Sequence, residues 1–308
     1  MNNFSRILCL IIALTLSVST VADQPAHDIS STDYWQMVFA EEDTVDYPIV
    51  FVHGIAGGFS DWDQTVSNIS GGTHFSMRYN DDGELFNNYN GLPPKTTNWI
   101  WNVSYYHDTP VKEAFQGNLT TYAERLREII TVVKNISGSE KVVIISHSMG
   151  GLVSRAYMSL DESCWNSVHK IVTVAAPHEG VKTSVGIVGQ LKDLRKGSDF
   201  IIQLKADWLS KIEQGYKHWG VIGAVDIDAD ETPSLPKAGS MTDSGGIGFI
   251  EFSSAIPFSE WMSCVDDQFG VVAYDTPHFG YRVAIRGEHN EILQFAPIYR
   301  IIEWAIQP

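Results

Sequence analysis

Cysteine is scarce in this chain: the 308 residues contain only Cys9, Cys164 and Cys264. No histidine pattern accompanies these cysteines, which argues against a zinc site. Charged residues are also few, at 19%, which argues against long disordered tails. With 44% hydrophobic residues, a chain of this length can bury a substantial core, as one large domain or two small ones.

Positive charge is low as well. Lysine and arginine number 21 against 37 aspartates and glutamates, so the net charge is −16. An acidic surface repels phosphate backbones, so we expect no nucleic-acid partner. The acidic segment "DIDADE", 226–231, alternates carboxylates as calcium loops do, but it lacks the following glycine and the distal glutamate. We therefore expect a solvated acidic loop, no metal and no cofactor.

Long apolar runs are confined to the N-terminus. Arg6 precedes an apolar run from Ile7 to Val18, and small residues follow at Thr20 and Ala22. This pattern is typical of a signal peptide spanning residues 1–22, although a buried N-terminal helix is the alternative. We predict cleavage after Ala22, a single domain over 23–308, and a secreted or periplasmic location. Cys9 lacks the small neighbour of a lipid-attachment site.

Two cysteines remain after that cleavage. In an oxidising compartment a pair is more often bridged than free, so Cys164 and Cys264 are candidates for a disulfide. Four sequons also occur, and they matter only in a host that glycosylates. They begin at Asn68, Asn102, Asn118 and Asn135.

Apolar strands and amphipathic helices alternate along most of the chain. Expected strands cover 47–54, 97–107, 141–145, 169–177 and 281–287; expected helices cover 119–138, 149–160 and 290–307, the last interrupted near Pro297. Alternation at this spacing indicates βαβ units, and continuous apolar strands suit a sheet covered on both faces. The predicted fold class is α/β, with a mostly parallel central sheet flanked by helices.

The stretch 181–263 interrupts this alternation. It contains a candidate helix over 198–216, a strand-like segment over 218–226 and a polar segment over 227–246. We expect an insertion folded over the sheet rather than a separate domain. The apolar and aromatic content of 198–222 favours a lid or an acyl-chain pocket.

A serine lies where one predicted strand passes directly into a helix, in "VVIISHSMGGLVSRAY", 142–157. Such a turn is tight, and small residues are needed two positions on either side of Ser148, here Ser146 and Gly150. This is the nucleophile-elbow pattern G-x-S-x-G with serine in place of its first glycine. The alternative is that Ser148 only caps the helix. Capping would not require Gly150-Gly151.

A glycine-rich turn, "VHGIAGG" over 52–58, follows an earlier strand. An enzyme that attacks a carbonyl must stabilise a negative oxygen, and backbone N–H groups are suitable donors. We expect the donors to be the N–H groups of Ile55 and Met149. His53, Gly54, His147 and Gly150 would support the two turns.

The segments "PIVFVHGIAGG", "SHSMGGLVSRAY" and "VTVAAPHEG" (172–180) together resemble secreted bacterial lipases of the α/β-hydrolase family. Ala176 stands where that family usually has threonine. The resemblance covers about 47–180 well and 264–295 more loosely. It implies the α/β-hydrolase fold with a lid-like insertion around 181–263. The wider group includes deacylases that act on glycolipid anchors, so the substrate does not follow from it.

A serine nucleophile needs a base, and in this fold the order along the chain is nucleophile, acid, histidine. His289 follows a strand and is preferred over His278, which precedes it. The segment "CVDDQFGVVAYDTPHFG", 264–280, resembles the family's Asp-Gly-Val-Val segment. Asp267 is the expected acid, and Asp266 and Asp226 remain alternatives.

These residues predict a serine hydrolase that cleaves carboxylic esters, a lipase or carboxylesterase acting on apolar acyl chains. The expected partner is an ester or lipid substrate, with transient contact to a lipid surface. A phospholipase, a glycolipid deacylase or an acyltransferase could use the same triad. A catalytically silent binding protein of the same fold is the second alternative.

Overall fold

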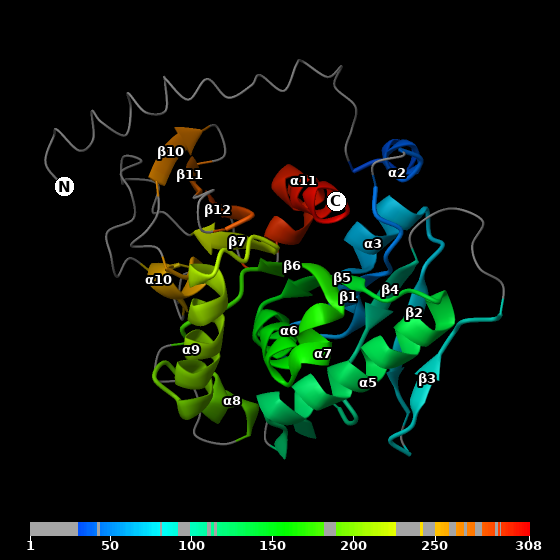
Figure 1. Ribbon diagram of the computed structural model, residues 1–308, viewed down its shortest axis with the longest axis horizontal. Coiled ribbons are helices and arrows are strands. Elements are labelled where there is room, and N and C mark those ends of the chain that lie inside the picture. The colour runs from blue at the N-terminus through cyan, green and yellow to red at the C-terminus, as the bar shows by residue number, and fades with distance from the viewer. Residues whose placement is uncertain are drawn as a thin grey trace, which may run out of the picture.

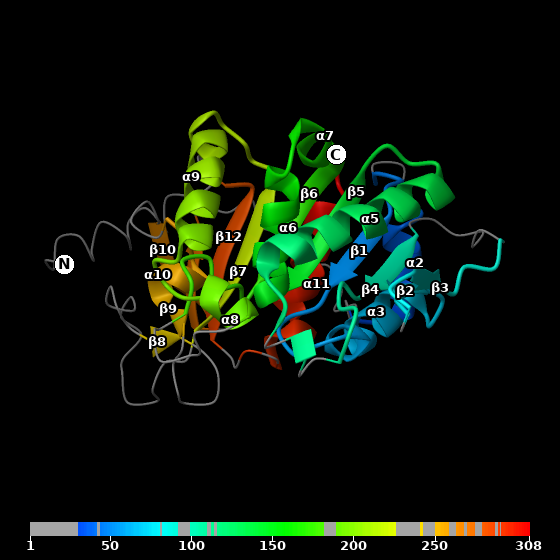
Figure 2. The same ribbon diagram turned by 90° about the horizontal axis from the view of Figure 1, so that it is seen from below.

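A central sheet between two layers of helices forms the body of the protein (Figures 1 and 2). The computed structural model describes residues 30–41, 44–80, 82–91, 99–109, 112–113, 116–181, 189–225, 241–242, 250–258, 263–267, 270–274, 279–286, 289 and 291–308. Residues 1–29 lie outside this set, as do Asp226 and His278. The predicted signal peptide is therefore not among the described residues.

The main sheet has eight strands in the order β12-β7-β6-β5-β1-β4-β2-β3. All neighbouring pairs are parallel except β2 and β3, which are antiparallel. The strands are β1 Ile49–Val52, β2 Phe75–Tyr79, β3 Leu85–Asn87, β4 Ile100–Val103, β5 Val142–His147, β6 Val168–Val174, β7 Trp219–Val225 and β12 Tyr281–Arg286. This arrangement confirms the predicted fold class.

Helices cover both faces of the sheet because its inner strands are apolar on both sides. In β5, Val142 and Ile144 face one core cluster, and Val143 and Ile145 face the other. The first cluster includes side chains of α5 (Leu119–Ser137), α6 (Met149–Ser159) and α9 (Asp199–Glu213). The second includes side chains of α2 (Thr32–Val38), α3 (Asp63–Ser70) and α11 (Ala296–Ala305).

Local signals set the ends of the predicted helices. Asn118 caps α5 by accepting a hydrogen bond from the Thr121 N–H at 2.8 Å, and Gly138 ends it in the left-handed region. The last helix is interrupted near Pro297, as expected. Pro297 lies in the first turn of α11, where its missing N–H costs nothing, and the break falls before it, after η3 (Glu291–Gln294).

Short elements complete the fold. They are η1 Phe59–Asp61, α7 Glu162–Asn166, α8 Gln190–Asp193, α10 Phe252–Ala255, β8 Met241–Thr242, β9 Ile250–Glu251, β10 Ser263–Asp267 and β11 Gly270–Tyr274. The antiparallel pair β10–β11 lies beside β12. No helix among the described residues is both long and apolar enough to cross a membrane.

Part of the segment expected as an insertion belongs to the central architecture. β7 pairs with β6 on one side and with β12 on the other, and α9 packs on α6. The side chain of Trp208 on α9 is fully buried, and its Nε1 donates to the Arg155 carbonyl at 3.2 Å. Residues 199–225 therefore form a flanking helix and a central strand, which differs from the expected lid.

The predicted disulfide between Cys164 and Cys264 is wrong: Cys164 is a free thiol. It lies in α7, which contacts α6 and β6, whereas Cys264 belongs to β10, beyond β12 at the edge of the sheet (Figure 1). Cys164 is only 5% exposed, and burial raises its pKa to about 11. One sequon is also excluded as a glycosylation site, because Asn102 is buried within β4.

Candidate active site

Ser148 occupies a strained turn between β5 and α6. Its backbone angles are φ 51° and ψ −127°, a region that costs a non-glycine residue free energy and is concentrated at functional sites. Its N–H donates to the Val174 carbonyl on the neighbouring strand at 2.8 Å. The side chain makes no capping hydrogen bond to the helix, so the capping alternative is wrong.

Small residues flank Ser148 because two turns meet there. A Cβ on Gly150 would lie 2.3 Å from the carbonyl oxygen of His53. A Cβ on Gly54 would lie 2.9 Å from the Cβ of Ser148. Ser146 fits in place of the usual glycine because its hydroxyl donates to the Val172 carbonyl on β6 at 2.8 Å. The elbow is therefore packed directly against the turn that follows β1.

Side chains hold the carbonyl groups of that turn in fixed directions. The indole of Trp62 donates to the Val52 carbonyl at 3.0 Å, and the Tyr105 hydroxyl donates to the His53 carbonyl at 3.1 Å. Nδ1 of His53 lies 2.7 Å from the carbonyl oxygen of Gly54. Burial lowers the pKa of His53 to about 4, so the ring is neutral at pH 7. Its one proton is then on Nδ1, facing that carbonyl.

The N–H of Ile55 has no acceptor within the described part of the chain. The Gly54 N–H donates to Asp61, the Ala56 N–H to the Tyr106 hydroxyl, and the Gly57 N–H back to the Gly54 carbonyl. The C=O of Gly54 and the N–H of Ile55 belong to one trans peptide and point in opposite directions. His53 therefore fixes the direction of the Ile55 N–H.

Met149 supplies a second N–H beside the serine. It is the first residue of α6, where backbone N–H groups have no partner inside the helix. Within the described residues its N–H has no acceptor either. The N-terminus of a helix also carries partial positive charge, which favours an anion there. The two N–H groups expected from the sequence are thus both available.

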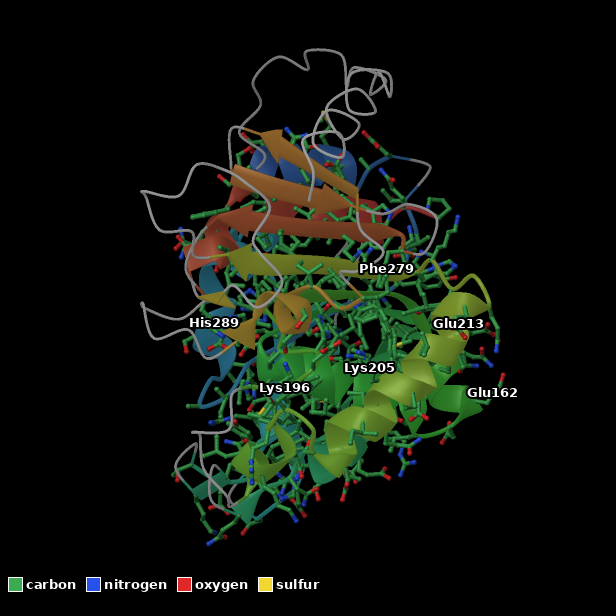
Figure 3. The ribbon with its side chains drawn as sticks, turned by 90° about the vertical axis from the view of Figure 1, so that its left-hand side faces the viewer. Glu162, Lys196, Lys205, Glu213, Phe279 and His289 are labelled. Carbon is green, nitrogen blue, oxygen red and sulfur yellow. The ribbon has the colours of Figure 1, made fainter. Side chains whose placement is uncertain are left out.

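His289 lies beside the elbow, at the end of the sheet where β5 and β7 finish. The rings of His289 and His147 are 4.7 Å apart between centroids, and Nε2 of His147 lies 3.2 Å from the carbonyl oxygen of His289. Figure 3 shows His289 at the opposite end of the strands from Glu162 and Glu213, which precede β6 and β7. The fold thus places residue 289 next to residue 147.

The hydroxyl of Ser148 and the ring of His289 make no hydrogen bond in this structure, in which the serine is 5% exposed. Catalytic hydrogen bonds are often long in the absence of substrate and shorten when it binds. Asp266 and Asp267 end β10, and their side chains lie outside the described residues, as does Asp226. The identity of the acid stays a prediction.

Sequence reasoning missed three side chains of this site. Asp61, Tyr105 and Tyr106 all bond to the turn over 53–56, from positions 7 to 52 residues away. The only local signal was the aspartate in "GGFSDWD", three residues after the second glycine. Within the described residues, no cluster of metal-binding side chains occurs.

The parallel sheet, the strained serine after β5 and the turn after β1 define the class of this protein: it has the α/β-hydrolase fold. Solved structures agree with this class. A protein of Listeria innocua, the product of the gene lin2722, aligns over 84% of this chain and 93% of its own, with a TM-score of 0.55 and 12% identity. The mature lipase BlEst2 of Bacillus licheniformis aligns over 87% and 94%, with a TM-score of 0.51 and 15% identity.

Sequence comparison identifies more specific relatives. Residues 43–195 match the model of the PGAP1-like alpha/beta domain. A GPI inositol-deacylase of Debaryomyces hansenii is 31% identical over 137 residues, and GPI inositol-deacylase B of Yarrowia lipolytica is 30% identical over 144. Each match covers 42% of this chain but only 12% and 13% of those relatives. These relatives are fungal and do not support the bacterial origin that the motif resemblance suggests.

Proposed function

We propose that this protein is a serine hydrolase that cleaves a carboxylic ester of a lipid. The observation that carries the proposal is the strained backbone of Ser148 beside the N–H groups of Ile55 and Met149, which have no acceptor among the described residues. A turn that costs free energy and sets a hydroxyl next to two oriented donors suits an acyl-transfer site. The lipase among the structural neighbours agrees with this fold but leaves the substrate open.

In the proposed reaction, Oγ of Ser148 attacks the ester carbonyl carbon and gives its proton to His289. The oxygen that becomes negative accepts hydrogen bonds from the N–H groups of Ile55 and Met149. The C–O bond to the alcohol then breaks, and the alcohol leaves with the proton from His289. Water attacks the acyl-enzyme in the same way and releases the acid. Asp267 is the proposed partner of His289, and Asp266 and Asp226 are its rivals.

The proposed substrate carries an apolar acyl chain. Ile55 is one of the few large hydrophobic side chains exposed in the described structure, at 36%, and it belongs to the turn that holds the donor N–H. An acyl chain whose carbonyl oxygen reaches that N–H would pass beside this apolar side chain. Burying such a contact contributes on the order of 25 cal/mol per Å² of apolar surface.

A deacylase acting on a glycolipid is the second candidate. It is favoured by the match of residues 43–195 to the PGAP1-like domain, a segment that contains Ile55, Ser148 and Met149. The chemistry at the serine would be the same, and only the alcohol would differ: an acylated inositol headgroup instead of a glycerol. We also propose that the protein is exported after a signal peptide, residues 1–22, is removed.

The proposal is tested by labelling with a fluorophosphonate probe and by hydrolysis of p-nitrophenyl esters of increasing chain length. We expect Ser148→Ala to abolish labelling and to lower kcat/KM by roughly 10⁴-fold or more, because the nucleophile is lost. Ser154→Ala is the matched control on α6. The Ser154 hydroxyl is buried and has no hydrogen-bond partner among the residues that the structure describes, so its loss should leave labelling and turnover unchanged.

Retained turnover in Ser148→Ala would refute the proposal, and a wild-type protein that neither reacts with the probe nor hydrolyses esters would favour the silent binding protein. Mass spectrometry of fatty acid released from triacylglycerol, diacyl phospholipid and inositol-acylated glycolipid separates the substrate classes. Transfer of the acyl group to an added alcohol in preference to water would indicate an acyltransferase.

A further inference from the structure

A second carboxylate, that of Asp61, lies beneath the elbow at the end of η1. Its Oδ2 accepts a hydrogen bond from the Gly54 N–H at 2.9 Å and lies 3.3 Å from Nδ1 of His147. The side chain is 17% exposed and that of His147 is 3% exposed. The Oδ2 atom of Asp61 therefore contacts both Gly54, in the turn after β1, and His147, the residue before Ser148. His147 lies 86 positions after Asp61 in the chain.

The turn is shaped around this carboxylate. A Cβ on Gly57 would lie 2.4 Å from Oδ2 and 2.7 Å from Oδ1 of Asp61, so the first glycine of the pair 57–58 provides the space that the carboxylate occupies. A Cβ on Gly58 would meet nothing within 4 Å. The glycine at 57 is thus explained by Asp61 and not by its own backbone angles.

Asp61 is held in its charged form. Burial alone would raise its pKa, but hydrogen bonds from His147 and the Gly54 N–H lower it below its ordinary value of 3.8. Burial lowers the pKa of His147, although Asp61 partly opposes this. A neutral His147 carries one proton and donates to only one of its two oxygen neighbours, whereas the protonated ring, which Asp61 favours, donates to Asp61 and to the His289 carbonyl together.

The same pair reaches the loop of the proposed base. Nε2 of His147 lies 3.2 Å from the carbonyl oxygen of His289, and the two rings are in contact. Asp61 thus contacts the donor turn directly, and it contacts the imidazole of His147, whose ring packs against that of His289. The donor turn and the His289 loop are the two segments that must hold fixed positions relative to Ser148 during catalysis.

From these contacts we infer that Asp61 is a positioning residue for ester cleavage: through Gly54 and His147 it holds the Ile55 N–H and the His289 loop in register with Ser148. The inference rests on the proposed function. Asp61 itself touches neither substrate nor the reacting atoms. Its contribution is expressed in the transition state, when the donor must meet a negative oxygen and not a neutral carbonyl.

The test compares Asp61→Ala, Asp61→Asn and, as a control, Asp63→Asn on p-nitrophenyl ester hydrolysis. Removing an oxyanion donor outright lowers kcat about 10²–10³-fold, and misplacing one costs less. We expect Asp61→Ala to lower kcat about 10–100-fold with KM changed less than about 3-fold. Asp61→Asn keeps an oxygen acceptor, and we expect a loss in kcat of about 3–10-fold. Asp63 is exposed two residues away, and its Oδ1 accepts a hydrogen bond from the Asn102 side chain at 3.2 Å; asparagine keeps that acceptor, so this variant should match the wild type.

Two further measurements separate positioning from a merely structural role. Rates are expressed per site titrated with the fluorophosphonate, so that unfolded molecules do not count. The affinity for an alkyl trifluoromethyl ketone, which forms a tetrahedral adduct with a negative oxygen, should fall by the same factor as kcat/KM. The KM for the ester substrate should not change by this factor.

Wild-type kcat per titrated site in folded Asp61→Ala would overturn the inference while leaving the proposed function intact. So would a loss confined to KM or to the fraction of titratable sites. A wild-type protein without labelling or turnover would overturn both. If Asp61→Ala does not fold, Asp61→Asn decides: a kcat and a ketone affinity equal to those of the wild type would overturn the inference.

Discussion

Gly57 and Gly58 are neighbours in the sequence but have different surroundings. A methyl group at position 57 would collide with the carboxylate of Asp61, whereas one at position 58 would point into open space. Gly58 has extended backbone angles (φ −175°, ψ −150°). An alanine at either position stiffens the turn, but only an alanine at position 57 also displaces the carboxylate of Asp61. Comparing the two variants therefore separates these effects.

We predict that Gly57→Ala lowers kcat about 10-fold or more and that Gly58→Ala leaves it within about 2-fold, because only the first moves Asp61. The carboxylate is the end of a side chain and can move away, so the free energy of unfolding should fall by only about 1 kcal/mol in Gly57→Ala. Esterase kinetics and urea unfolding of both variants check this. Equal kinetics in the two variants would contradict it.

At this scale the sequence identifies what local backbone geometry demands. Ser148, Gly150 and the turn with Ile55 could be predicted because a strand that passes directly into a helix, or ends in a glycine-rich turn, needs particular residues within a few positions. Asp61 could not be found in this way, since its contact with His147 spans 86 positions and depends on how β1 and β5 pair.

Helix α9 and strand β7 act as parts of the sheet layers. The ring of Trp208 on α9 packs 4.7 Å from that of Trp219 on β7, between centroids, and 4.9 Å from the guanidinium of Arg155 on α6. Ile202 lies on the other side of the same helix and is 58% exposed. A lid helix would show the reverse, with little buried between it and the layer below.

We predict that Trp208→Ala lowers the free energy of unfolding by about 3–5 kcal/mol, because it leaves a cavity in a closed core. Ile202→Ala should change it by less than about 0.5 kcal/mol. Urea unfolding measures both, and turnover per titrated site should remain near that of the wild type in each. A Trp208→Ala protein with normal stability but altered chain-length preference would restore the lid interpretation.

The elements with continuous apolar runs were predictable, and those without them were not. β5, α5 and α6 have nearly the expected bounds because their hydrophobic spacing matches one period. β2 and β3 carry mixed polar and apolar residues near the sheet edge and went unrecognised. β7 was expected as a strand, but hydrophobicity alone does not show which strands it pairs with. The sequence also gives no information on the distance between Cys164 and Cys264, so the disulfide could not be judged from it.

At the scale of the whole molecule, the neutral form is favoured at seven of the histidines that the structure describes. Burial is the main cause in each case, and it lowers the pKa of His53, His74, His107, His147, His169, His178 and His218. In the unfolded chain these rings titrate near 6.5. Below that pH the unfolded state binds more protons than the folded state, so the free energy of unfolding must fall as the solution becomes more acidic.

We predict a lower urea midpoint at pH 5.5 than at pH 7.5. For a fully buried ring such as His53, whose pKa falls to about 4, the loss over this interval is about 1.4 kcal/mol. The pKa values of Asp61 and Asp161 are lowered, so these carboxylates add to the loss of stability on acidification and do not oppose it. In His53→Gln the difference between the two pH values should shrink by about that amount. A midpoint that is equal or higher at pH 5.5 would contradict the prediction.

The proposed catalytic groups follow inner strands of the eight-stranded sheet in one case and its last strand in the other. Everything that would cradle a negative oxygen comes from β1 and β5, which have neighbours on both sides, and from residues within the 43–195 segment. The histidine that would accept the proton arrives on the loop after β12, the last strand of the row, which pairs with β7 alone within that sheet. Local loosening of β12 would move His289 away from Ser148 and stop proton transfer, while the N–H groups of Ile55 and Met149 stayed in place. The protein could therefore lose its activity without unfolding.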